Sequence, residues 1–136
     1  MKYNLSEITD LIRNRRTIYP EQYSSRKVQK DQIEMLLNNA IWAPTHGNTQ
    51  PWRFTVLYSD ESRQQLADFM SALYLEKIPK EEQKDPKLAK LLTRPKQTSV
   101  VIAVSMKRDE TEKIREVEEI EAVACAIHNI ALSAAA

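Results

Sequence analysis

The sequence predicts an α+β protein, because helical periodicity recurs in four segments and the pattern of a β-strand occurs in two. Its 136 residues fit one domain, and 42% hydrophobic with 29% charged residues is the composition of an ordinary globular protein. Two strands alone do not form an independently stable sheet. We therefore expect a single domain over residues 1–136 that is incomplete without further chain or a partner.

The N-terminal part is predicted to be a short helix followed by irregular chain. The apolar residues of this helix fall on one face, at Leu5, Ile8, Leu11 and Ile12. Ser6 lies in the region where an N-cap is expected. The helix ends in the basic run RNRR, residues 13–16, and residues 17–28 follow no regular pattern.

The next segment predicts a stronger helix over 31–43, then a loop and a strand. Asp31 precedes apolar residues at helical spacing, which are Ile33, Leu36, Leu37, Ala40 and Ile41. Pro44 disfavours helical geometry at Ala43 and so ends the helix. After the loop, RFTVLY (53–58) alternates and is rich in strand-forming residues.

The remaining chain predicts a helix, a polar stretch, a strand and a last helix. The first of these begins near Ser59 or Asp60 and carries Leu66, Phe69, Met70 and Leu73. Residues 76–97 contain three prolines and suit short helical pieces or a lid. The apolar run SVVIAVSM (99–106) is typical of a strand buried on both faces, as in parallel sheets. The helix over 118–136 has an apolar face of Ile120, Val123, Ile127, Ile130 and Ala134.

Charge and hydropathy exclude several classes of partner. A net charge of +1 gives no reason to expect nucleic acid or an anionic membrane surface. The longest apolar run, 100–104, is too short to span a bilayer, and the N-terminus lacks the apolar core of a signal peptide. One cysteine excludes an internal disulfide framework, so we expect a cytoplasmic protein.

The glycine content suggests that the domain continues beyond Ala136. The chain has one glycine, Gly47, whereas average usage predicts roughly nine or ten. The last helix also stops at LSAAA without a glycine or a polar C-cap. We therefore expect a chain that is shorter than its complete fold.

The basic segment Arg15, Arg16 and Thr17 is the first candidate binding site. Two guanidinium groups and a hydroxyl at a helix end suit a phosphate, through charge-assisted and bidentate hydrogen bonds. The alternative is that arginines in a last helical turn only complement the helix dipole.

The loop WAPTHGNTQPW, residues 42–52, is the second candidate, since it gathers both tryptophans and the only glycine. Asn48 and Gln50 offer amide donors and acceptors, as recognition of a heteroaromatic edge requires, and His46 suits donation to a cofactor or substrate. The alternative is a turn whose polar groups bond their own backbone. Trp52 at the start of a strand is more typical of core than of a ligand platform.

Other polar residues have plainer interpretations. His128 is predicted to be a partly buried structural residue and Cys125 part of the core. One interpretation makes acid/base groups of Glu118, Glu119 and Glu121, but a charge run on a helix is more typical of a solvated face. No zinc-type Cys/His spacing occurs, GxGxxG and GxxxxGK[ST] are absent, and no side chain is singled out as a catalytic acid.

Taken in order, RRT (15–17), the helix 31–43 and APTHGNTQPWRF (43–54) resemble the FMN-dependent nitroreductase family. That family has an RRS-type motif and an APSxxNxQPW-like segment before a strand. The loop is similar to that of a subgroup of small nitroreductases that carry histidine there. The resemblance implies a mixed sheet flanked by helices, here lacking the C-terminal strands. It also implies an intertwined homodimer with each flavin at the subunit interface.

The resemblance also implies a set of cofactor-binding residues. Arg15 and Arg16 stand where the family holds the FMN phosphate and ribityl chain, with Thr17 in place of the commoner serine. The loop residues that approach the flavin are then Trp42, His46, Asn48 and Gln50. Two departures are Tyr19, where many members have another basic residue, and the missing Gly-rich AxGxG segment with the strands and C-terminal Arg or Lys that follow it.

The function implied is that of an FMN-dependent oxidoreductase. A hydride would pass from NAD(P)H through FMN to a nitroaromatic, a quinone or a related small-molecule acceptor, with the chemistry carried by the flavin. The alternative is a truncated, inactive homologue that acts only as a folding, dimerisation or flavin-binding module.

Overall fold

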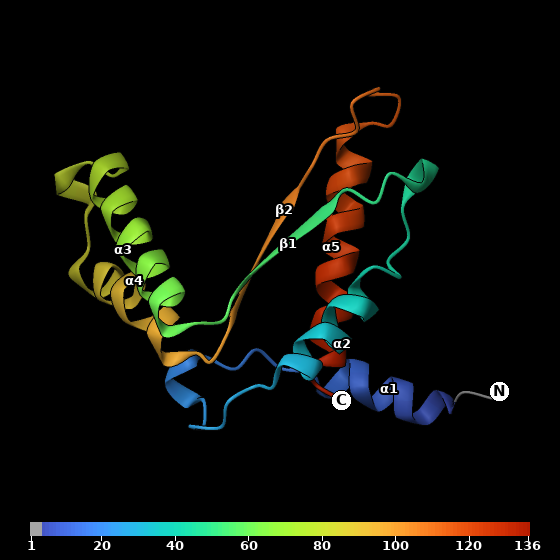
Figure 1. Ribbon diagram of the computed structural model, residues 1–136, viewed down its shortest axis with the longest axis horizontal. Helices are drawn as coiled ribbons and strands as arrows, with labels where there is room; N and C mark the ends of the chain where they lie inside the picture. Colours follow the sequence, from blue (N-terminus) through green and yellow to red (C-terminus); the bar gives the residue numbers. More distant parts are fainter. Residues whose placement is uncertain (1–3) are drawn as a thin grey trace. The chain divides into compact units, whose positions relative to one another are not determined.

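The computed structural model describes residues 4–136 and confirms an α+β fold (Figure 1). Its helices and strands, in chain order, are α1 (Leu5–Asn14), α2 (Lys30–Ala40), β1 (Trp52–Leu57), α3 (Asp60–Lys77), α4 (Asp85–Gln97), β2 (Val101–Met106) and α5 (Glu116–Ser133). Three short 3₁₀ turns complete them, η1 (Pro20–Gln22), η2 (His46–Asn48) and η3 (Lys80–Glu82).

The chain forms two compact units, which are described separately. Unit 1 comprises the described residues up to Thr17 together with Gln29–Phe54 and Val104–Ala136. Unit 2 comprises Ile18–Val28 and Thr55–Ala103. Every cofactor-binding residue predicted from the sequence lies in unit 1.

The two strands pair with each other in antiparallel order. The Lys107 N–H donates to the Pro51 carbonyl at 2.8 Å, which sets the register at one end of the pair. The prediction of a strand buried on both faces, as in a parallel sheet, was wrong. Residues of β2 are partly buried or exposed, because within this chain the apolar run has close packing on one side only.

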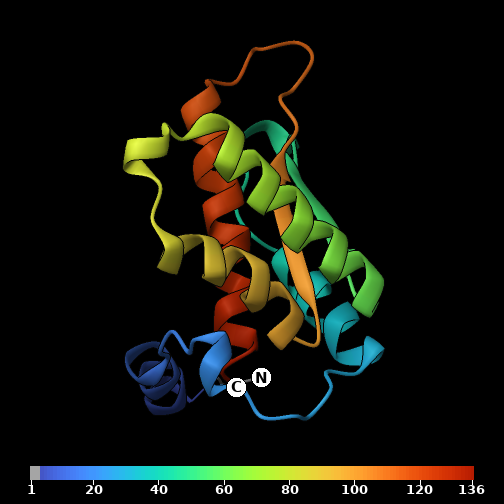
Figure 2. The same cartoon turned by 90° about the vertical axis from the view of Figure 1, so that its left-hand side faces the viewer.

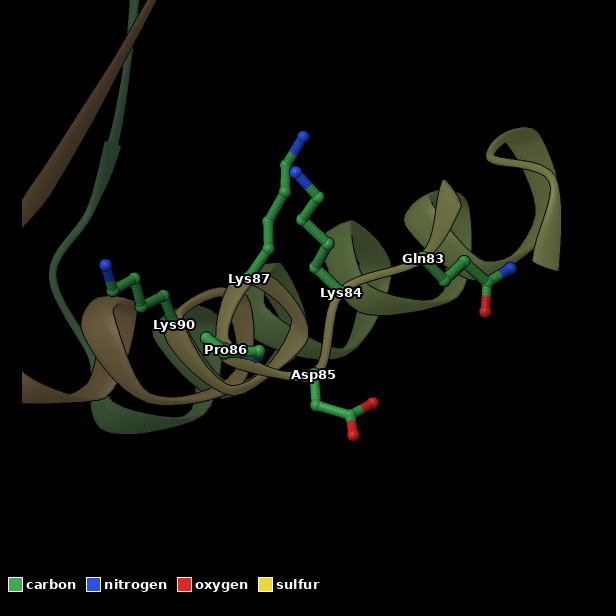
Figure 3. A pocket seen from close by; sticks show the side chains of 6 residues that line it. All are labelled: Gln83, Lys84, Asp85, Pro86, Lys87 and Lys90. Atoms are coloured by element: carbon green, nitrogen blue, oxygen red, sulfur yellow. The ribbon is translucent and has the colours of Figure 1, made fainter. Parts of the chain in front are cut away.

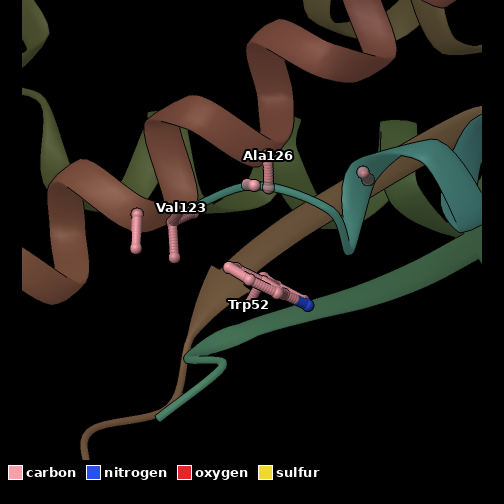
Figure 4. Close-up of a cluster of buried hydrophobic side chains, with 6 residues drawn as sticks. Trp52, Val123 and Ala126 are labelled. Carbon is pink, nitrogen blue, oxygen red and sulfur yellow. The ribbon is translucent and has the colours of Figure 1, made fainter. Parts of the chain in front are cut away.

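The core of unit 1 forms where α2 and α5 pack together over the start of β1 (Figure 4). Its buried members are Ala40, Ala43, Trp52, Ala122, Val123 and Ala126. Small side chains on both helices let the backbones approach, and the Trp52 ring fills the space beneath them. Asn39 joins the C-terminal ends of α2 and α5, since its Nδ2 donates to Ser133 Oγ at 2.9 Å. Trp52 is therefore a core residue, as predicted.

Unit 2 is built on a helical hairpin in which α3 packs against α4. The buried Arg63 guanidinium donates to the carbonyls of Tyr58 and Ser99, so it ties the start of α3 to the chain before β2. The Tyr74 hydroxyl accepts from the Lys84 N–H at 2.8 Å and fixes the turn between the helices. Residues 76–97 hold the end of α3, a 3₁₀ turn and α4, with Pro95 inside it, so the prediction of helical pieces is confirmed.

The helix boundaries differ slightly from those predicted. Asn4, not Ser6, caps α1, because its side chain accepts from the Ser6 N–H at 3.0 Å. The second helix begins at Lys30 and ends at Ala40, and the last one runs from Glu116 to Ser133. Ser59 caps α3 as predicted, accepting from the Ser62 N–H.

The helices α1 and α5 of unit 1 carry several exposed apolar residues. No residue of α1 is buried, and Leu5, Ile8 and Ile12 face outward. On α5, Ile120 and Ile127 were predicted to share the core face with Val123, but both are exposed. The core instead takes the alanine-rich face, which leaves a second apolar face at Val117, Ile120 and Ile127. None of the described helices is long and apolar enough to cross a membrane.

Candidate functional site

The loop between α2 and β1 has an unusual backbone. Three of its residues have positive φ angles, Gly47 at 58°, Asn48 at 56° and Gln50 at 45°. A Cβ at Gly47 would lie 3.3 Å from the Ile114 Cδ1, so this position combines a left-handed conformation with a close neighbour. Positive φ is uncommon outside glycine, and clusters of it favour a functional loop.

Two threonines close the loop on itself. The Thr45 and Thr49 hydroxyls lie 3.1 Å apart, and the Gln50 N–H donates to Thr45 Oγ1 at 3.2 Å. The turn-forming interpretation is correct for these residues. It leaves the side chains of Asn48 and Gln50 exposed, with no hydrogen bond to any residue in the described range 4–136.

The two tryptophans of this loop have opposite environments. Trp52 is buried at the base of the loop, whereas Trp42 is 84% exposed, the highest value among the exposed large apolar side chains of the described chain. Pro51 is fully buried beside Trp52. The loop is therefore anchored at its end by core residues and presents an aromatic surface at its beginning.

His46 is held by a carboxylate from α5. Its Nδ1 forms a hydrogen bond with Glu118 Oε2, and the imidazole is otherwise 66% exposed. The second oxygen, Glu118 Oε1, accepts from Arg115 Nε at 2.8 Å and lies 2.7 Å from Arg115 Nη2. Hydrogen bonds from His46 and then from Arg115 lower the pKa of Glu118 from its ordinary value of 4.5.

The neighbouring Glu119 is buried, so the prediction of a solvated face was wrong for this residue. Its side chain is 1% exposed, pairs with Arg108, and accepts from the Asp109 N–H at 3.0 Å. Adjacent helical positions point in different directions, and here one of them points at the chain that leads out of β2. Glu119 therefore fixes the loop 107–115 on α5.

The segment that follows α1 is far less constrained. The Arg16 guanidinium donates to backbone carbonyls at Arg13 and Arg15, the latter at 2.9 Å. Arg15 is half-buried and its guanidinium has no hydrogen bond or ion pair within residues 4–136. Thr17 is exposed. These three residues offer donors that the described chain does not use.

The structure brings the predicted residues together in two groups, not one. Trp42, His46, Asn48 and Gln50 share the loop beside the first turn of α5, which carries Glu118. Figures 1 and 2 place α1 and the segment after it at the other end of α5, beside the C-terminus. We call Arg15–Thr17 the arginine segment and residues 42–50 the histidine loop. Within one chain, these two therefore lie at opposite ends of α5.

Several other residues differ from the roles predicted for them or make contacts that the sequence did not suggest. His128 is exposed rather than partly buried, because it lies on the side of α5 away from the core. Cys125 packs against the core, as predicted.

In unit 2, the Tyr19 ring lies 5.2 Å from the Arg94 guanidinium, which also pairs with Glu21. Among residues 4–136, no cluster of three His, Cys, Asp or Glu side chains is placed to hold a metal ion.

A pocket beside the first turn of α4 lies apart from the predicted site residues (Figure 3). Lys84 and Lys87 extend to one side of it and Asp85 to the other. All of its lining residues belong to unit 2, and none belongs to the histidine loop or the arginine segment.

Sequence reasoning missed the residues that hold the histidine loop. Glu118 was predicted to lie on a solvated face, and Ile114 was not singled out. Their neighbours are distant in the chain, Gly47 for Ile114 and His46 for Glu118. A helical pattern shows which residues share a face, but not which loop lies opposite that face.

The model of the nitroreductase family matches residues 12–136. The chain belongs to this family. The match includes both groups of site residues, the arginine segment and the histidine loop, and it extends through α5.

Several nitroreductase relatives resemble the chain over most of its length. The protein named "Putative NAD(P)H nitroreductase YfhC" of Bacillus subtilis is 28% identical over 95% of this chain and 64% of its own length. A nitroreductase-like family protein of Bacillus cereus has a TM-score of 0.76 at 28% identity, over 98% of this chain and 66% of that one. A structure described as a "putative nitroreductase in complex with fmn", from Desulfovibrio desulfuricans, has a TM-score of 0.69 at 26% identity, over 98% and 63%.

The chain spans only part of the length of these nitroreductases. For three curated relatives, the matched share of their own length is 36%, 64% and 31%.

Proposed function

We propose that the protein is an FMN-dependent oxidoreductase. It would pass a hydride from NAD(P)H, through FMN, to a nitroaromatic, a quinone or a related acceptor. The single observation that carries this proposal is the family match across 12–136, which contains every predicted cofactor-binding residue. The FMN complex of the Desulfovibrio desulfuricans relative and the NAD(P)H in the name of the Bacillus subtilis relative support the cofactor and the co-substrate.

The unused donors of the chain fit the chemistry of FMN. A phosphate requires cationic donors, and Arg15 has a guanidinium without a partner in the described chain. Thr17 offers an unused hydroxyl for a polyol chain. Asn48 and Gln50 have amide groups free for the edge of a heteroaromatic ring, and Trp42 provides an exposed aromatic face.

Each side chain then has a defined task. When bound, FMN supplies the two-electron chemistry between NAD(P)H and the second substrate. Arg15 and Arg16 would hold the phosphate, and the Thr17 hydroxyl would bond the ribityl chain next to it. The amides of Asn48 and Gln50 would orient the ring edge, and Trp42 would offer an aromatic face beside it. No side chain of this chain is assigned as a proton donor.

The two groups of residues favour a site between two copies of the chain. Glu118 and Ser133, near the two ends of α5, are separated by about 22 Å at 1.5 Å per residue. In a suitable twofold dimer, the arginine segment of one copy would meet the histidine loop of the other without spanning that length. The exposed apolar faces of α1 and α5, together with Trp42, offer surface that a second copy would bury.

An FMN titration of the purified chain tests the proposal. We expect saturable quenching of flavin fluorescence, a dimer by light scattering, and anaerobic bleaching of the yellow colour by NADH or NADPH. Reoxidation by a nitroaromatic and by a quinone then compares the two acceptor classes. A chain that takes up no FMN overturns the proposal. A chain that binds FMN but is not bleached has the alternative function of a flavin-binding module.

A further inference from the structure

The contact between His46 and Glu118 has a chemical consequence for the histidine ring. Ionised carboxylates only accept hydrogen bonds, so the nitrogen that faces Glu118 must carry a proton. Nδ1 is therefore the N–H nitrogen in both charge states of the ring. Nε2 remains for a ligand, as an acceptor when the imidazole is neutral and as a donor when it is charged.

The Glu118 carboxylate is itself fixed at both oxygens. Oε1 receives the Arg115 side chain through two nitrogens, and Oε2 receives His46. Glu118 also lies in the first turn of α5, where the helix dipole favours an anion. With one partner on each oxygen, rotation of the carboxylate away from His46 would break the contacts with Arg115 as well.

The backbone beneath this contact is held by separate interactions. A Cβ at Gly47 would make a tight contact, 3.3 Å, with Ile114 Cδ1, so the two loops lie close together. Glu119 anchors the loop 107–115 through Arg108 and the Asp109 N–H. Both ends of the Glu118–His46 contact therefore rest on fixed chain.

We propose that Glu118, held by Arg115, is a positioning residue that locks His46 as the Nδ1–H tautomer and presents Nε2 to the ligand of this loop. The tautomer itself follows from contacts within unit 1. Nitro and quinone oxygens only accept hydrogen bonds, so Nε2 binds an oxygen atom of the electron acceptor as the N–H donor of the charged ring. This use of Nε2 rests on the proposed function. The two parts are therefore tested separately.

Nitrogen NMR of the cofactor-free chain tests the tautomer. The sequence has two histidines, and His128→Gln assigns their signals. At a pH where the rings are neutral, we expect His46 Nδ1 to show the shift of a protonated nitrogen and Nε2 that of an unprotonated one. In Glu118→Gln, whose amide can donate as well as accept, we expect a mixture of tautomers.

Glu121→Gln is the matched control, since it removes the same charge from an exposed position on the same helix. We expect it to leave the His46 signals unchanged. Arg115→Gln, which keeps the carboxylate, should give an intermediate mixture. An Nε2–H tautomer in the unmodified chain overturns the proposal without any variant. A Glu118→Gln spectrum equal to that of the unmodified chain overturns it as well.

Kinetics of the FMN-loaded protein test the use of Nε2. We expect His46→Gln and Glu118→Gln each to raise the KM for the acceptor about tenfold, as loss of one charged hydrogen bond does, and the FMN Kd of each variant is measured separately so that saturating FMN is used in the assay. The double variant should be no worse than His46→Gln alone. Additive effects, or an unchanged KM, overturn this role. A chain that never binds FMN fails the proposed function, while the NMR result still decides the tautomer.

Discussion

The histidine loop and the arginine segment belong to the same unit but differ in how firmly they are held. In the loop, Thr45 and Thr49 close the turn, Glu118 holds His46, and Trp52 anchors the following strand. After α1, Arg16 bonds only to nearby backbone, and Arg15 has no side-chain partner in the described range. One half of the candidate site is preorganised, and the other is not.

This difference indicates a division of labour. A preorganised loop orients a ligand without further loss of conformational freedom, so it suits selectivity and geometry. Flexible arginines lose side-chain entropy on binding, and a doubly charged phosphate offers strong bonds to offset that cost. We therefore expect the loop to determine which acceptor binds and the arginines to determine how tightly the cofactor is held.

The two tryptophans test the anchoring of the loop, with the largest expected effect. Trp52→Ala removes a buried ring from the core and should lower the free energy of unfolding by about 3–5 kcal/mol. Trp42→Ala, the matched control in the same loop, should change the free energy of unfolding of the single chain by about 0.5 kcal/mol or less, because that ring is exposed within one chain. Urea denaturation measures both. Equal losses would mean that the loop is not anchored at its Trp52 end.

The sequence predicted the helices and strands because their signals are local. Apolar spacing located α2, and the serine before α3 located its start. The same approach could not predict the direction of β2, because an apolar run does not specify its partner strand. It also assigned Ile120 and Ile127 to the core. Alanines make a good packing face against α2 while isoleucines remain exposed, and a periodic pattern does not distinguish two apolar faces of one helix.

The candidate site is inferred from two contiguous motifs, and the assignment of their residues to FMN stays a prediction. The turn-forming alternative agrees with the contact between Thr45 and Thr49. The roles of Glu118 and Glu119 could not be predicted, since adjacent glutamates in a charged run look alike. One lies against His46 and the other against Arg108 only after α5 has packed against the loops that precede it.

Arg15 tests the loosely held half of the site. We expect Arg15→Ala to weaken FMN binding about tenfold, because a charge-assisted bond to phosphate is lost, and to leave the melting temperature unchanged. Arg26→Ala is the matched control, an exposed arginine outside unit 1. Fluorescence titration gives both dissociation constants. If the two variants weaken FMN equally, the arginine segment acts only through general charge.

The pH dependence of Glu118 tests the firmly held half, with the smallest expected effect. Its pKa is lowered in the folded protein by His46 and Arg115, so its contribution to stability is complete above the ordinary value of 4.5. As the pH falls through the lowered pKa, the carboxylate is protonated and the contribution is lost. Glu118→Gln should therefore be less stable than the unmodified chain at pH 7, and this difference should vanish well below pH 4.5.

Glu121→Gln serves as the control for this pH series, because it removes an exposed carboxylate of the same helix that has no partner among residues 4–136. Its melting temperature should follow that of the unmodified chain at every pH. The exposed position of the Glu118 pair and its screening by water limit the expected difference at neutral pH to a few degrees or less. A difference that persists unchanged into acid would assign the effect of Glu118→Gln to packing, and the histidine loop would then owe its fixed conformation to Ile114 and the threonines alone.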